Sequence, residues 1–455
     1  MRVIIIGAGT GGMCLAHGLR RAGVDVVVYE RDRTRTSGLH GYRVGIDPHG
    51  SRALKACLPP ELYRTFVATC ARAPEWFAFL DERLRPTLTL RLRPAADDVN
   101  DEKSVSRMTL RQVLFTGMED VIRFDKEFQR YSHTPDGRVT AHFADGTADT
   151  ADLLVGADGV NSPVRRQRLP HARLEDAGIV AIAAKVPMTP ESTALMPPGL
   201  FPGIGLILAP RGLACILHWM EFPWSADGRP EPAGNDADLL AAWPGLLFDN
   251  TRDYLNWGLS AATGRFPADV MDRHGRDLVD LAIRMTPRWD ARLHRLFALT
   301  DPSTCFPINI RTSVRVDPWP TDNVTLLGDA IHTMTPGQGV GANTALRDAH
   351  HLVQALTSGR PLLEAVAAYE RAMLEYGFAA VEASKRQTGG DQLIHKPVIG
   401  RLALAGQRAF LRATDRIPAL KRRFEAGLYE TRGTLEAEDG GEVADRLQDV
   451  GGARG

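Results

Sequence analysis

Residues 2–30, RVIIIGAGTGGMCLAHGLRRAGVDVVVYE, contain the pattern that decides the fold. The uninterrupted apolar run RVIII is typical of a buried parallel strand. The glycine turn GAGTGG follows, and MCLAHGLRRAG then carries apolar side chains at helical spacing. A second apolar run, VDVVVYE, ends in an acid. This order of strand, glycine turn, helix and strand predicts a Rossmann-type unit at the start of an α/β protein.

The glycine turn has the spacing of a dinucleotide-binding fingerprint, GxGxxG. Its glycines allow a tight turn, close approach of a pyrophosphate and close packing of the helix. The helix start offers amide donors to the phosphates, and the acid at the end of the second strand suits a ribose. This unit alone leaves both NAD and FAD open as the ligand. The residues expected to contact the dinucleotide are Gly7, Gly9, Thr10, Gly11, Gly12, Glu30 and Arg31.

Two similar turns occur far along the chain. Residues 151–166, ADLLVGADGVNSPVRR, place Asp158 after an apolar run and before a helix start marked by proline. Residues 326–349, LLGDAIHTMTPGQGVGANTALRDA, place Asp329 after another apolar run, followed by a glycine-rich loop and a helix. Neither turn carries a nucleophile with an adjacent base or a cluster of metal ligands, so we expect the reactive group to belong to a cofactor.

These three turns resemble the ordered GxGxxG, DG and GD motifs of the class A FAD-dependent monooxygenases, the para-hydroxybenzoate hydroxylase superfamily. The resemblance covers residues 1–185 and 300–375 well and the middle in outline. It implies a discontinuous, Rossmann-type FAD-binding domain, an interleaved substrate domain that is mainly antiparallel β-sheet, and C-terminal helices. The implied ranges are 1–175 with 300–375 for FAD, 176–299 for substrate and 376–432 for the C-terminal helices. Residues 433–455 are acidic, rich in Gly and Ala and without aromatics, which predicts a disordered tail.

The resemblance also implies roles for single residues. Asp329 is expected to bind the ribityl chain of FAD, and the following loop to bring backbone amides to the pyrimidine end of the ring, where negative charge develops on reduction. Arg43 is expected near the flavin and the incoming nicotinamide, and it is a candidate for a catalytic residue. His332 is expected to be a packed residue that supports the loop, with a catalytic base as the alternative. The expected FAD contacts beyond the first unit are Arg43, Arg107, Arg111, Asp158, Asp329, Pro336, Gly339, Val340, Gly341, Ala342 and Asn343.

The implied activity is monooxygenation. In the family, NADPH or NADH reduces FAD, O2 then forms a C4a-hydroperoxide, and one oxygen atom passes to the substrate. Hydroxylation, epoxidation and Baeyer–Villiger oxidation share this intermediate, so the reaction subtype and the choice of nicotinamide stay open. The alternative is a reductase or dehydrogenase of the same fold that incorporates no oxygen. The intact GD motif argues against a third class, a binding protein without activity.

The middle of the chain reads as strands joined by turns, with large apolar side chains that suit an apolar pocket. Such a pocket would take an apolar or aromatic small molecule. The candidate substrate contacts are Trp219, Met220 and Trp257.

Composition limits the remaining possibilities. The 455 residues include 55 Lys plus Arg and 55 Asp plus Glu, and this balance argues against a nucleic-acid partner. Five scattered cysteines in no metal-binding spacing predict reduced thiols, no metal site and a cytoplasmic location. No apolar run is long enough to cross a bilayer. Residues 398–425 are basic and amphipathic, so a packing helix and a membrane-surface helix both remain open, as do a monomer and a homodimer.

Overall fold

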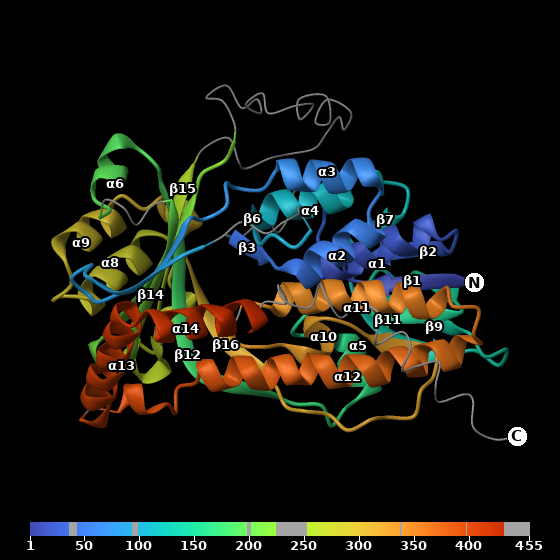
Figure 1. The fold of residues 1–455 in the computed structure, drawn as a ribbon. Coiled ribbons are helices and arrows are strands. Elements are labelled where there is room, and N and C mark those ends of the chain that lie inside the picture. Colours follow the sequence, from blue (N-terminus) through green and yellow to red (C-terminus); the bar gives the residue numbers. More distant parts are fainter. Residues whose placement is uncertain are drawn as a thin grey trace, which may run out of the picture.

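The fold is organised around two β-sheets of different construction, which lie side by side (Figure 1). The computed structural model describes residues 1–35, 43–92, 99–197, 202–223, 253–336, 339–396 and 398–431. The predicted tail, residues 433–455, lies outside the described residues.

The first sheet has five strands, and every neighbouring pair is parallel. Helices cover both of its faces, which explains why the central residues of its strands form unbroken buried apolar runs rather than alternating (Figure 1). Its strands, in order across the sheet, are β17 (Val324–Leu326), β11 (Leu153–Gly156), β1 (Arg2–Ile6), β2 (Asp25–Tyr29) and β7 (Ile122–Arg123).

The helices around this sheet come from distant parts of the chain. Helix α1 packs against α2, α4 and α11, and α11 packs in turn against α12. The helices of this part are α1 (Thr10–Arg21), α2 (Pro48–Cys57), α3 (Pro60–Ala68), α4 (Arg107–Phe115), α5 (Pro163–Arg168), α10 (Asp329–His332), α11 (Gly341–Leu356) and α12 (Leu362–Gln387). Two small antiparallel sheets accompany them: β3 (Arg43–Ile46) with β6 (Lys103–Ser106), and β8 (Phe128–His133) with β9 (Val139–Phe143) and β10 (Ala148–Ala151).

The second sheet has seven strands, and all neighbouring pairs except β13 with β4 are antiparallel. One of its faces is covered by α8 (Arg276–Met285) and α9 (Ala291–Ala298), whose apolar side chains share a core with it. A short helix, α6 (Pro190–Ala194), follows its longest strand. Its strands, in order, are β16 (Phe306–Ser313), β12 (Leu174–Pro187), β15 (Tyr254–Ala262), β14 (Leu213–Met220), β13 (Gly203–Ala209), β4 (Trp76–Leu80) and β5 (Pro86–Arg91).

The predicted fold class is confirmed: a Rossmann-type α/β part with an interleaved, mainly antiparallel sheet and C-terminal helices. The interleaving is deeper than the predicted ranges. Strands β4 and β5, within 1–175, and β16, within 300–375, belong to the seven-stranded sheet. The reason is that β4 pairs with β13, far along the chain, and the apolar pattern of a strand does not identify its partner.

The chain ends in two further helices, α13 (Ile399–Arg416) and α14 (Pro418–Thr431). Helix α13 packs on β5 and on α14, and it lies at the edge of the molecule (Figure 1). In the described part of the chain, no helix has both the length and the apolar character needed to span a bilayer.

Candidate cofactor-binding site

Three strand-to-helix turns meet at one edge of the five-stranded sheet. They follow β1, β11 and β17, which are neighbouring parallel strands, so their carboxyl ends lie together. Backbone hydrogen bonds join the turns, from Ala157 N to Ile6 O at 2.8 Å and from Leu327 N to Gly156 O at 3.0 Å. Motifs that are far apart in the sequence therefore form one continuous surface.

The glycines of the first turn have two different roles. Gly7 has φ +104°, and a Cβ added there would lie 2.5 Å from Ala157 O. A Cβ on Gly12 would lie 2.2 Å from Gly7 O, so both positions require glycine for packing. A Cβ on Gly9 would approach only Ala157 O, at 4.0 Å. The backbone at Gly9 is exposed and open, as the approach of a pyrophosphate requires.

Close packing of the first and third turns depends on two more glycines. A Cβ on Gly11 would lie 2.7 Å from Leu327 Cδ1, so this glycine lets α1 approach the end of β17. Gly328 has φ +60°, and its Cβ would lie 2.9 Å from that of Ala345 on α11. The structure thus gives Gly11 a packing role, beside the cofactor contact expected from the sequence.

Two helices begin at this edge without a side-chain cap. Helix α1 begins at the half-buried Thr10 after Gly9, and α11 begins at Gly341 after Val340. The first amides of a helix have no partner within the helix and carry its positive dipole end. Both helix starts are therefore suited to anionic acceptors.

Glu30 closes the first unit with its carboxylate buried. Its Oε2 accepts the amide of Ala8 at 2.7 Å, and its Oε1 accepts the amide of Asp32 at 3.0 Å. A carboxylate has further lone pairs, so these bonds leave acceptor capacity for a ribose hydroxyl. Arg111 donates to Asp32 at 2.6 Å, which places it at the end of β2, whereas Arg31 is exposed.

Asp158, in the second turn, has a carboxylate oxygen without a donor. Its Oδ2 accepts the amide of Val164 at 3.2 Å, but its Oδ1 is buried and has no hydrogen-bond partner among the described residues. Burial raises the pKa of Asp158. A buried acceptor without a donor costs free energy, which marks this position as one where a ligand donor fits.

Arg165 joins the second turn to the third. Its guanidinium is buried and donates to Ala330 O and to Val160 O, both at 2.9 Å. We did not predict this residue, although the arginine that follows the proline in the second motif is visible in the sequence.

Asp329 is the first residue of α10, and its side chain reaches solvent. Protein nevertheless surrounds it closely enough that desolvation raises the pKa of Asp329, while the positive charges of His332 and Arg107 oppose that rise. Arg107 is exposed at the start of α4. The two side chains therefore provide an acceptor and a cation close to the meeting point of the turns.

The glycine-rich loop is tied down by Asn343 rather than by its exposed residues. Asn343 is buried, donates to Gly45 O at 3.0 Å and accepts the amide of Asp47 at 3.1 Å. Pro336 and Gly339 are exposed, while Val340, Gly341 and Ala342 are half-buried; residues 337 and 338 lie outside the described residues. The Asn343 side chain thus positions the loop against β3.

Comparisons with known proteins agree with this geometry. The NAD(P)-binding Rossmann-like domain family matches residues 5–82, and the FAD binding domain family matches residues 282–367. The crystal structure of the FAD containing monooxygenase from Photorhabdus luminescens is 34% identical, with a TM-score of 0.72, and the match covers 85% of this chain and 97% of that chain. This chain belongs to the class A FAD-dependent monooxygenases.

Two further proteins are similar to this chain. The dual O-methyltransferase/FAD-dependent monooxygenase CTB3 of Cercospora beticola is 33% identical over 82% of this chain and 44% of its own length. The chain spans about half the length, 44–47%, of this and two similar dual proteins. The crystal structure of Klebsiella pneumoniae HpxO with FAD and uric acid is 22% identical to this chain, with a TM-score of 0.72. The match covers 95% of this chain and 97% of that chain and shows that the two share a fold.

The residues at the edge of the five-stranded sheet fit FAD, the cofactor of this family. Gly9 leaves an open cradle for a pyrophosphate, two uncapped helix starts offer amides, and Asp158 and Asp329 offer acceptors. This donor set suits an extended ligand with phosphates and hydroxyl groups.

Arg43 links the cofactor edge to the seven-stranded sheet. Its Nε donates to Ser104 Oγ at 3.0 Å, and Glu102 lies 3.4 Å from its guanidinium. Ser104 Oγ in turn lies 3.3 Å from His218 Nε2 on β14. Because Asn343 bonds to Gly45 on the same strand as Arg43, the two-stranded sheet of β3 and β6 lies between the glycine-rich loop and the second sheet.

The three candidate substrate residues lie on opposite faces of this sheet. Trp219 and Trp257 are on the face covered by α8 and α9, and the tilted rings of Trp257 and Phe297 have centroids 4.7 Å apart. Successive residues of a strand point to opposite faces, so Met220 shares the other face with His218. The apolar residues in this stretch identify the strand, but its two faces look alike in sequence.

Asn256 lies on that second face, directly across the strand pair from His218. Its side chain is buried, and its Oδ1 has no hydrogen-bond partner within the described part of the chain. His218 and Asn256 do not stand out in the sequence, because a polar residue in a strand usually faces solvent.

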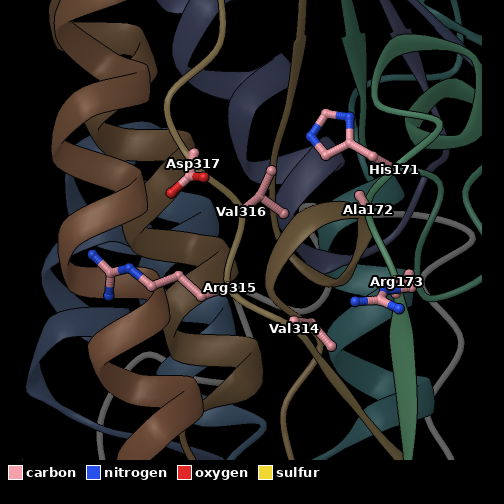
Figure 2. Close-up of a pocket in the computed structure, with 7 residues that line it drawn as sticks. All are labelled: His171, Ala172, Arg173, Val314, Arg315, Val316 and Asp317. Atoms are coloured by element: carbon pink, nitrogen blue, oxygen red, sulfur yellow. The ribbon is translucent and has the colours of Figure 1, made fainter.

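A hollow of about 340 Å³ lies elsewhere, between the segment before β12 and the segment after β16. Figure 2 shows that Arg315 points away from it toward the neighbouring helix, while His171 and Arg173 come from the opposite wall. The expected cofactor residues do not line it. The three turns that carry most of the expected FAD residues lie instead at the edge of the five-stranded sheet.

Proposed function

We propose that this chain uses NADPH or NADH as reductant and transfers one atom of O2 to an apolar or aromatic small molecule, by hydroxylation or epoxidation. The observation that carries this proposal is the convergence of the three turns at one sheet edge, with Asp329 open to solvent among them. When bound there, FAD supplies the redox chemistry of electron transfer and oxygen activation. The protein contributes binding, orientation and electrostatics.

In this proposal, the first unit holds the adenosine diphosphate part of FAD. The amides after Gly9 face the pyrophosphate, and the remaining lone pairs of Glu30 accept the ribose hydroxyls. Asp329 accepts hydrogen bonds from the ribityl chain, and Arg107 adds a positive charge beside it.

The start of α11 would hold the pyrimidine end of the flavin ring. Its uncapped amides and its dipole stabilise negative charge there without placing a reactive side chain against the ring. Asn343 keeps this helix start in place through its two bonds to the β3 segment. The chain thus stabilises the charge of the reduced cofactor with its backbone.

The substrate would lie between the two-stranded β3–β6 sheet and the face of β14 and β15 that carries Met220 and Asn256. Met220 is buried on this face beside Phe222 and Tyr254, and Asn256 supplies a carbonyl oxygen that has no donor among the described residues. Burying such an acceptor is costly unless a ligand donates to it. We infer that the preferred substrate is an apolar or aromatic molecule with a hydroxyl or amino donor.

The test begins with the purified protein, which is expected to be yellow and to release FAD on denaturation. Aromatic and other apolar compounds are then screened for faster oxidation of NADPH or NADH. Products formed under isotopically labelled O2 are analysed by mass spectrometry, and one labelled oxygen atom is expected. Substrate-dependent NAD(P)H oxidation with reduced, unlabelled product would identify a reductase and overturn monooxygenation.

A further inference from the structure

Large apolar side chains gather on the outer surface around α13. Ten large hydrophobic residues are exposed in the part of the chain that the structure describes, and six of them fall within residues 393–417. Their exposed fractions range from 46% to 73%. We name this group the α13 ridge: Leu393, Val398, Ile399, Leu402, Phe410 and Ile417.

Helix α13 has two apolar faces, and the described residues cover only one. Its inner face carries Leu404 and Leu411, both buried, and Leu411 packs against Leu88 and Leu90 of β5. The outer face carries Ile399, Leu402 and Phe410 at helical spacing, and the other ridge residues, Leu393, Val398 and Ile417, lie just outside the two ends of the helix. The exposed residues Ala405, Gly406 and Ala409 lie between them. Figure 1 places this helix at the edge of the molecule, away from the five-stranded sheet.

Positive charge surrounds the ridge. Arg401, Arg412 and Arg416 on α13 are exposed, and no ion pair joins them to an acid of the described residues. The one acid of α13, Asp415, is engaged, because it accepts Lys421 at 3.0 Å and the amide of Thr89 at 3.2 Å. Exposed Arg422 and Arg423 on α14 and Lys396 before α13 add further charge.

Exposed apolar side chains next to positive charge favour one kind of partner. A second copy of the chain would bring two sets of arginines together, and like charges across an interface are repulsive. An anionic bilayer has the opposite charge at its surface and apolar chains just beneath it. We propose that the α13 ridge docks the protein on an anionic lipid surface, with the ridge at the acyl boundary and the arginines at the headgroups. This proposal stands apart from the activity proposed above.

Vesicle sedimentation with the full-length, FAD-loaded protein tests the proposal. Binding is expected to vesicles that contain phosphatidylglycerol, to weaken with added salt, and to be much weaker to pure phosphatidylcholine. The double variant Leu402→Ser/Phe410→Ser and the triple variant Arg401→Gln/Arg412→Gln/Arg416→Gln should each bind more than about tenfold less tightly. The matched control Met271→Ser/Leu363→Ser, which changes exposed apolar residues elsewhere, should bind as the wild type does.

Flavin absorbance and the thermal transition confirm that each variant is folded, since all changed side chains are exposed. Absence of vesicle binding, equal binding to neutral and anionic vesicles, or wild-type binding by both variants would overturn the proposal. Light scattering that shows a dimer which the Leu402→Ser/Phe410→Ser variant dissociates, together with no lipid binding, would identify a second copy as the occupant instead.

Discussion

The Nε2 atom of His332 lies 2.6 Å from a carboxylate oxygen of Asp348, and neither side chain is exposed. The same oxygen accepts the amide of Gly328 at 2.7 Å, and the other oxygen accepts the Tyr376 hydroxyl at 2.6 Å. One buried carboxylate therefore holds the turn that presents Asp329. This network agrees with the expectation that His332 is a packed residue supporting the loop.

Replacing Asp348 tests this support. Asp348→Ala leaves three donors without their acceptor, two of them on the buried residues Gly328 and His332, so the free energy of unfolding should fall by about 3–5 kcal/mol. FAD occupancy should fall too, because the Gly328–Asp329 turn loses its anchor. Denaturant unfolding and the ratio of FAD to protein measure the two effects. The control is Asp317→Asn, which changes an exposed carboxylate. If Asp348→Ala kept the stability and FAD content of the wild type, Asp348 would not be the support of this turn.

The stability should depend on pH through His332. Burial alone would lower the pKa of His332, but the Asp348 carboxylate offsets this effect and raises the pKa above its usual value. The folded state therefore holds the proton more tightly, and the resulting stabilisation is complete below about pH 6.5 and lost as pH rises through the folded pKa. Its size is about 1.4 kcal/mol for each unit by which the pKa is raised.

The measurement compares unfolding free energies of the wild type and His332→Gln from about pH 6 to pH 9. The wild type should lose more stability over this interval than the variant, because groups shared by both proteins cancel in the difference. Parallel curves would show that the His332 proton makes no contribution.

Two glycines of the first turn should separate folding from cofactor binding. Gly12→Ala places a Cβ 2.2 Å from Gly7 O, so the protein should be destabilised by several kcal/mol or fail to fold. Gly9→Ala meets nothing closer than 4.0 Å, so its stability should remain within about 1 kcal/mol of the wild type. Its FAD occupancy should nevertheless fall, because the new methyl group occupies the pyrophosphate cradle. Full FAD content in a folded Gly9→Ala variant would refute that position of the pyrophosphate.

Asp329→Asn should mainly affect the cofactor. The Asp329 side chain reaches solvent and makes no hydrogen bond to a described residue, so stability without FAD should change by less than about 1 kcal/mol. The affinity for FAD should fall at least about tenfold, since a charged acceptor bond is worth about 1.5–3 kcal/mol. Fluorescence titration of the FAD-free protein measures this, again with Asp317→Asn as the control. Unchanged FAD affinity would disprove the proposed contact.

The two faces of β15 should respond differently to substitution. Trp257→Phe removes the bond from Nε1 to Thr300 Oγ1, 2.9 Å long, and should lower stability by about 1–3 kcal/mol with the same preferred substrates. Asn256→Leu removes a buried carbonyl oxygen that has no donor, so the free energy of unfolding should stay unchanged. The preferred substrates in the NAD(P)H oxidation screen should shift toward compounds without a hydrogen-bond donor. If Trp257→Phe changed the preferred substrates and Asn256→Leu did not, the substrate pocket would lie on the Trp257 face and the proposed position would be wrong.

Local sequence patterns predicted much of the fold of this protein. Apolar runs of strand length, glycines at the spacing of a turn and the residues that begin a helix are short-range features, and they predicted the Rossmann-type unit and the three turns. They also led to the FAD-dependent family, which the comparisons confirm. The roles assigned to single cofactor residues, such as Asp329 and Arg107, stay predictions.

Tertiary structure decided the rest, because it depends on pairing between distant segments. Strand β4 joins the second sheet only through its pairing with β13, and no local pattern of β4 specifies that partner. The face on which Asn256 or Trp257 lies follows from sheet packing, since both faces of these strands carry apolar side chains. The buried contact between Asp348 and His332 arises only when α11 packs behind the third turn. The sequence by itself determined the strands, turns and cofactor class, while three-dimensional packing decided which side chains meet.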